Sequence, residues 1–134
     1  RILEFQGNKV IPVNIINDRG IHICQSMVAY QKWGKKQKPN KKGDHFVGDY
    51  YVLFSKKSKE DPNLDLEAKS LLLKWEEEDP ETHKLWRKMN TWVLQGFQET
   101  YDRFGIAFEK EYFESEQISK QENPSMGCSI KWVY

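Results

Sequence analysis

Cysteine is scarce in this chain of 134 residues, which contains only Cys24 and Cys128. Two cysteines are too few for a disulfide framework or for a zinc site made of cysteine alone. The sequence has no run of 18 or more apolar residues, so it predicts no membrane-spanning helix. The first residues do not follow the basic-then-apolar pattern of a secretory signal peptide, and we therefore expect a cytoplasmic protein.

A strong net charge is missing too, because 21 basic and 20 acidic residues give a formal charge of +1. Dedicated nucleic-acid-binding domains are usually far more basic. The local distribution is uneven, however, since six of the eleven residues 32–42 are lysine. Such a run is usually a solvated surface, and the alternative is contact with RNA phosphates through charge. The candidates for RNA contact are Lys35, Lys36, Lys38, Lys41 and Lys42.

The short motifs of common nucleotide-binding and hydrolytic sites are missing as well. The chain contains no GxGxxG, no GxxxxGK[ST] and no GxSxG pattern. His22 and Cys24 are two positions apart, which places them on different sides of a helix. They therefore predict neither a pair of metal ligands nor a nucleophile and its base. The acidic run 76–78 lies at the polar end of an expected helix and is typical of a surface.

The sequence does contain a strand, several helices and a second strand, in that order. Residues 9–17 are mostly β-branched and predict a buried strand, with Pro12 at its start or on an edge. Apolar spacing of three and four predicts helices over 21–33, 44–54, 64–78 and 80–104. A second strand is expected to begin at Ile106 and to continue through Phe113. A long helical crossover makes two such strands parallel.

The fold class predicted from this order is α/β: an incomplete Rossmann-like parallel sheet of two to three strands, dominated by helices. Asp79 and Pro80 predict a helix start, Gly105 predicts its end, and Asp44 is expected to cap the helix that follows it. Residues 2–7 read as the end of a helix, so we expect the chain to be a fragment. Residues 1–117 form the expected domain, and 118–134 a divergent or truncated tail with a short strand over 128–134.

Polar residues follow each of the two expected strands. Asp18 and Gly20 come after the first strand, and Glu114 and Ser115 come after the second. Because ligands bind beyond the carboxyl ends of the strands in open α/β sheets, these residues are candidates for one edge of a cleft. The alternative is turn chemistry at Asp18 and Gly20 and helix capping by Ser115. A further set of aromatic residues at helical spacing is interpreted as core rather than as a base-stacking platform: Trp86, Trp92, Phe97 and Tyr101.

Three long runs of this sequence resemble the catalytic domain of arginyl-tRNA synthetases, which are class I enzymes. They are VNIINDRGIHICQSMVAYQKWG at 13–34, GDHFVGDYYVLF at 43–54, and LLLKWEEEDPETHKLWRKMNTWVLQGFQETYDRFGIAFEKEYFES at 71–115. The resemblance implies a nucleotide-binding fold in which the two strands are the second and third. It also implies that five residues lie beside the cleft, none of them catalytic: Asn17, Asp18, Gly20, Glu114 and Ser115.

The resemblance implies a parent enzyme that activates L-arginine with ATP and Mg²⁺ and transfers it to tRNA-Arg. The HIGH and KMSKS motifs that hold the ATP phosphates in class I enzymes are not in these 134 residues. We therefore expect the chain alone to hold no cofactor and to be inactive. The alternatives are a stand-alone RNA-binding or interaction domain that reuses the synthetase fold, or a non-functional fragment.

The implied sheet also predicts how the isolated chain behaves. Doubly wound sheets of this type run 3-2-1-4-5, so the strand at 9–17 would have lost a neighbour and would expose an apolar edge. We expect the isolated chain to dimerise through this edge, to exchange an element, or to be marginally stable.

Overall fold

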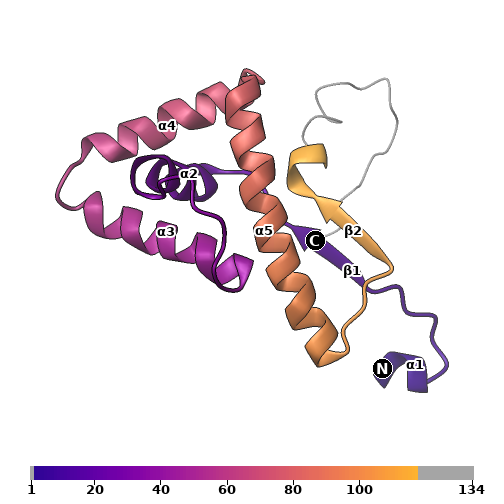
Figure 1. Ribbon diagram of the computed structural model, residues 1–134. Coiled ribbons are helices and arrows are strands. Elements are labelled where there is room, and N and C mark those ends of the chain that lie inside the picture. The colour runs from indigo at the N-terminus through magenta and orange to yellow at the C-terminus, as the bar shows by residue number, and fades with distance from the viewer. Residues whose placement is uncertain (1, 118–134) are drawn as a thin grey trace. The chain divides into compact units, whose positions relative to one another are not determined.

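The computed structural model describes residues 2–117, so Cys128, the tail from 118 and the strand expected at 128–134 lie outside the described residues. Residues 2–19 with 108–117 form one compact unit, and residues 20–107 form another. The described residues form these elements, in chain order (Figure 1): α1 (Ile2–Phe5), β1 (Val13–Ile16), α2 (Ile21–Trp33), α3 (Gly43–Lys57), α4 (Asn63–Glu76), α5 (Pro80–Phe104) and β2 (Lys110–Phe113).

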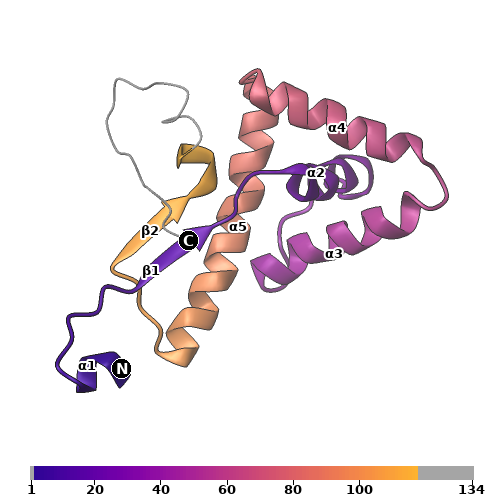
Figure 2. The same cartoon turned by 180° about the vertical axis from the view of Figure 1, so that it is seen from behind.

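The first unit contains a sheet in which β1 and β2 lie side by side (Figure 2). The strands are parallel, with Val13 paired with Lys110 and Ile16 paired with Phe113. Parallel pairing was the prediction from the long helical crossover, and it is confirmed. A parallel sheet in a chain dominated by helices fits the expected incomplete Rossmann-like α/β fold.

Both strands are shorter than the sequence pattern predicts. The first begins at Val13 rather than Lys9. Pro12, which has no N–H to donate, contributes only its carbonyl, which accepts a hydrogen bond of 2.8 Å from the backbone N–H of Glu109. The second strand begins at Lys110 rather than Ile106. The N–H of Ile106 donates instead to the carbonyl of Tyr101, so it closes the end of α5 and does not pair in a sheet.

The second unit is a packed group of four helices, in which α2 contacts α3 and α4, and α3 contacts α5. Figures 1 and 2 both show α2 between α3 and α4. Its core is made by one face of each helix, and the residues with at most 1% exposure are Met27, Ala29, Phe54, Ala68 and Met89. These side chains come from all four helices, so the unit has a single core.

The helix boundaries follow local rules at most ends. The Asp79 carboxylate accepts a hydrogen bond of 2.8 Å from the backbone N–H of Thr82, and Pro80 begins α5, as the sequence predicts. Gly105 ends α5 in the left-handed conformation, with φ of 62°. The prediction for Asp44 is wrong. Lys42 is the N-cap of α3, α3 begins at Gly43, and Asp44 lies in its first turn without capping it.

The beginning of α3 lies unusually close to α5. A Cβ on Gly43 would stand 1.9 Å from the carbonyl oxygen of Trp92, and a Cβ on Gly96 would stand 2.7 Å from the backbone nitrogen of Asp44. Real Cβ atoms do not tolerate such contacts, so glycine is required on both sides. Lys42, which directly precedes α3, lies beside this close approach and bonds to Thr100 of α5.

Candidate functional site

The carboxyl ends of the two parallel strands are joined by one pair of side chains. Asp18 follows β1 by two residues, and Ser115 lies in a helical turn at 114–117 that directly follows β2. Asp18 Oδ1 accepts a hydrogen bond of 2.9 Å from the backbone N–H of Ser115. Asp18 Oδ2 accepts a second one, of 2.6 Å, from the Ser115 hydroxyl. Both residues are predicted at this edge from the order of the strands, and the structure brings them into contact.

Asp18, which follows β1, acts as a cap for the helical turn that follows β2. A carboxylate at the start of a helical turn satisfies N–H groups that have no partner within the turn and interacts favourably with the helix dipole. Asp18 is only 6% exposed, and each of its two oxygens already accepts a hydrogen bond. Its geometry therefore suits holding the carboxyl ends of β1 and β2 together.

The other three cleft candidates have different surroundings. Asn17 is exposed, and Glu114 is half-buried. Gly20 belongs to the second unit, where it precedes α2 with φ of 126°, a conformation that favours glycine. That these three residues line a ligand cleft stays a prediction.

The five lysines predicted to contact RNA lie in the loop between α2 and α3 (residues 34–42, the lysine loop) and fall into two groups. Lys35, Lys36 and Lys38 are exposed, and the first two have positive φ angles of 45° and 58°. Lys41 pairs with Asp49, and Lys42 is half-buried and bonded within the unit. Only the first group is available to a partner without breaking an ion pair within the described residues.

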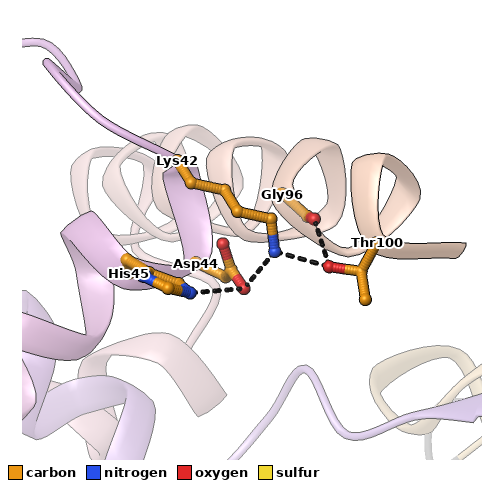
Figure 3. Close-up of polar contacts among 5 residues, drawn as sticks. All are labelled: Lys42, Asp44, His45, Gly96 and Thr100. Atoms are coloured by element: carbon orange, nitrogen blue, oxygen red, sulfur yellow. Dashed lines mark hydrogen bonds and ion pairs between the residues drawn. The ribbon is translucent and has the colours of Figure 1, made fainter. Parts of the chain in front are cut away.

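Figure 3 shows how Lys42 is held. Its ammonium lies 2.9 Å from Asp44 Oδ2 and donates a hydrogen bond of 2.5 Å to the hydroxyl of Thr100. That hydroxyl in turn donates to the carbonyl of Gly96, over 3.3 Å. Burial by itself raises the Asp44 pKa. The hydrogen bond from Lys42, its positive charge and the His45 backbone N–H together outweigh burial and lower the Asp44 pKa below its ordinary value. The network joins α3 to α5, so Lys42 has a structural role.

Sequence reasoning missed a second group of cations. Two adjacent hollows, of about 500 and about 480 Å³, lie along the first turns of α5. Lys84 lines both of them, Arg87 lines the first, and Lys36 and Lys88 line the second. The signal was the spacing of 84, 87 and 88, which places three cations on one face of a helix.

The aromatic residues of α5 divide along its length. Trp86 and Trp92 pack against the core of the second unit, as predicted. Phe97, by contrast, is 38% exposed, and its ring centroid lies 6.4 Å from that of Tyr101. The interpretation of all four residues as core is therefore wrong for Phe97, because the helices that cover Trp86 and Trp92 leave it partly open.

The structure of residues 2–117 offers little support for a metal site or a reactive thiol. In that range no three side chains of His, Cys, Asp or Glu are grouped closely enough to hold a metal ion. Burial, with a smaller contribution from the charge of Glu76, raises the pKa of the Cys24 thiol to about 11. The thiol is thus protonated at neutral pH and is a poor nucleophile.

None of the described helices is long and apolar enough to cross a membrane.

Comparison with known proteins gives a consistent result over nearly the whole chain. Residues 1–130 match the family described as tRNA synthetases class I (R), catalytic domain. A protein of Treponema denticola named arginine–tRNA ligase is 55% identical over 125 residues, which cover 90% of this chain and 21% of the relative.

Two further relatives carry the same name. The one from Borreliella afzelii is 50% identical over 119 residues, covering 87% of this chain and 20% of the relative. The one from Parabacteroides distasonis is 46% identical over 136 residues, covering 87% of this chain and 23% of the relative. The chain therefore spans about a fifth of the length of the curated relatives it matches.

Proposed function

The chain belongs to the family of class I arginyl-tRNA synthetase catalytic domains, and from this premise we propose that it is part of an arginine–tRNA ligase. The observation that carries the proposal is the match over residues 1–130, together with identities of 46–55% to proteins of that name. Because the chain spans about a fifth of those relatives, we assign the activity to the whole protein.

The reaction has two steps, both in the whole ligase. A carboxylate oxygen of L-arginine attacks the α-phosphorus of ATP, and the bond to pyrophosphate breaks, which leaves arginyl adenylate. A terminal ribose hydroxyl of tRNA-Arg then attacks the acyl carbon, and AMP leaves. Chemistry of this kind depends on positioning the reactants and on neutralising phosphate charge.

Within this reaction, the contribution of the segment is to shape one edge of the cleft. The residues that we propose for that edge are Asn17, Asp18, Gly20, Glu114 and Ser115. The support is the contact between Asp18 and Ser115, which fixes the carboxyl ends of two parallel strands, where ligands bind in open α/β sheets. Asp18 acts here as a positioning residue, because it holds Ser115 at the carboxyl end of β2.

The groups that neutralise the ATP phosphates come from elsewhere in the ligase. Neither HIGH nor KMSKS occurs in the 134 residues, and the described residues offer no cluster suited to a Mg²⁺ ion. We therefore assign no step of the reaction to a metal held by this segment. The ligase acts in translation, and a cytoplasmic location is part of the proposal.

The test is arginine-dependent charging of tRNA by the whole protein, beside the 134-residue chain alone. We expect charging of tRNA-Arg by the whole protein and no signal above background from the segment. Charging by the segment would show that it holds the ATP-binding groups. A whole protein that binds tRNA but never charges it would favour the alternative, an RNA-binding domain that reuses the fold.

A further inference from the structure

The two hollows along α5 are lined by an excess of positive charge. Lys36, Lys84, Arg87 and Lys88 contribute four cations, and Glu78 and Glu81 contribute two anions. Among the described residues, Lys36 and Arg87 make no ion pair. The contact between Lys84 and Glu81 is long, at 4.0 Å, and both side chains are about 80% exposed, so it neutralises little charge. The excess charge is therefore available to an external anion.

One of these cations is held in a defined position. The Lys88 ammonium lies 5.0 Å from the centre of the Trp92 ring and 5.4 Å from that of Tyr30. It also donates a hydrogen bond of 3.2 Å to the Tyr30 hydroxyl, which itself donates to the carbonyl of Gln37 over 2.8 Å. Tyr30 is 4% exposed. A buried ring thus orients Lys88 and also ties the lysine loop to the wall of the hollow.

We propose that these two hollows form a docking surface for the phosphate backbone of RNA, with Lys36, Lys84, Arg87 and Lys88 as the contacting cations. The choice of RNA as the source of the phosphates rests on the proposed function. The surface differs from the lysine loop of the sequence analysis, because three of its four cations lie on α5 and only Lys36 is shared.

The geometry favours a backbone over a free phosphate ion. Lys84 is shared by the two hollows, so the three cations of α5 form a row along the helix, and Lys36 lies beside this row rather than closing a pocket. Exposed ammonium groups bind one phosphate weakly, because water and salt compete for it. A row of cations facing a row of phosphates gains from the release of several counterions at once.

The experiment measures tRNA binding to the 134-residue chain at a series of salt concentrations. The test variant combines Lys36→Gln, Lys84→Gln and Arg87→Gln, three exposed positions that leave the Lys88–Tyr30 contact intact. The matched control removes three other exposed lysines of the same unit: Lys56→Gln, Lys59→Gln and Lys69→Gln. Circular dichroism and thermal unfolding verify that both variants keep the fold.

We expect the test variant to lower the slope of log affinity against log salt by about 1 for each cation removed, and the control to keep the wild-type slope. The loss should be equal for cognate and unrelated tRNA, since phosphates carry no sequence. An equal loss in both variants would overturn the proposal. The proposal would also be overturned if inorganic phosphate displaced tRNA while chloride at equal ionic strength did not. That result would indicate a site for a free phosphate ion.

A second readout separates this proposal from the proposed function. In the whole protein we expect the test variant to raise KM for tRNA and to leave kcat near wild type. A whole wild-type protein that does not charge tRNA with arginine would refute the ligase. A wild-type protein that charges tRNA, with a test variant of unchanged KM, would refute the docking surface alone.

Discussion

At the residue scale, two glycines decide how closely α3 and α5 approach each other. Gly96 is buried in α5, and its missing side chain leaves room for Asp44, whose Oδ1 would lie 2.3 Å from a Cβ at that position. Gly48 in α3 is exposed, and a Cβ there would meet nothing within 4 Å. The same substitution should therefore have opposite effects at the two sites.

We predict that Gly96→Ala destabilises the chain by about 1–3 kcal/mol, because the added methyl overpacks the contact with Asp44. The control Gly48→Ala should stabilise it by about 0.5–1 kcal/mol, because alanine favours a helix interior. Urea unfolding followed by circular dichroism measures both. Two variants of equal stability would show that α3 and α5 are not this close in solution.

Asp44 also makes stability depend on pH. Its folded pKa lies below the ordinary value of 3.8, so the unfolded chain binds more protons as pH falls through this range. The stabilisation is thus complete above the unfolded pKa and is lost as pH falls through the folded pKa. We predict that Asp44→Asn loses most stability near neutral pH and that its difference from wild type shrinks below about pH 4.

Urea unfolding at pH values from 3 to 7 checks this prediction. Thr100→Val, which removes the hydroxyl that accepts from Lys42 but keeps the Asp44 carboxylate, serves as the control. Its difference from wild type should vary less with pH. A constant difference for Asp44→Asn over the whole range would rule out a lowered pKa.

At the element scale, α5 is the longest helix of the described residues, and a capping residue marks each of its ends. The Asp79 carboxylate accepts hydrogen bonds from both the backbone N–H and the hydroxyl of Thr82, and these bonds lower the Asp79 pKa. At the other end, Gly105 takes the left-handed conformation, and its N–H donates to the last carbonyls of the helix. This stop separates α5 from β2.

Replacement of Gly105 tests that stop. We predict that Gly105→Ala lowers the free energy of unfolding by about 1–2 kcal/mol, because φ of 62° brings a Cβ close to the following carbonyl. Gly105→Asn should cost less, since asparagine enters this region more readily. Thermal unfolding of the three proteins gives the order. Alanine and asparagine variants of equal stability would contradict the capping role.

At the scale of the whole molecule, the first unit exposes much apolar surface for its size. Ile15 in β1 is 65% exposed, and Phe5 at the end of α1 is 95% exposed. A strand of this kind with an open edge is a template for association with another chain. The expected dimer of the isolated chain therefore remains a prediction.

We predict that the isolated chain associates with itself as its concentration rises, and that Ile15→Lys reduces this association because a charged residue blocks edge pairing. Analytical ultracentrifugation over a range of concentrations measures the effect. Lys replacement of the exposed Leu73 in the second unit is the control and should leave association unchanged. A monodisperse wild-type monomer with a high melting temperature would refute the prediction.

The amino-acid sequence by itself determined the helices, the order of the elements and the parallel pairing of the strands. These features depend on interactions between residues that are near in the chain, such as the cap at Asp79, the stop at Gly105 and the apolar spacing of α2. Two strands that are joined by a long helical crossover lie parallel, so the parallel sheet was also predictable. The family resemblance rested on long runs of sequence and needed no coordinates.

The tertiary structure decided the contacts between distant residues. Asp18 and Ser115 are 97 residues apart, and only the register of β1 on β2 shows that they bond. Lys42 was expected to be a free loop lysine, but the close approach of α3 to α5 gives it Asp44 and Thr100 as partners. Lys36 lines one hollow together with Lys84 and Lys88, which are far from it in the sequence. Local patterns fix the neighbours of a residue along a helix or strand, whereas packing fixes which charges face each other.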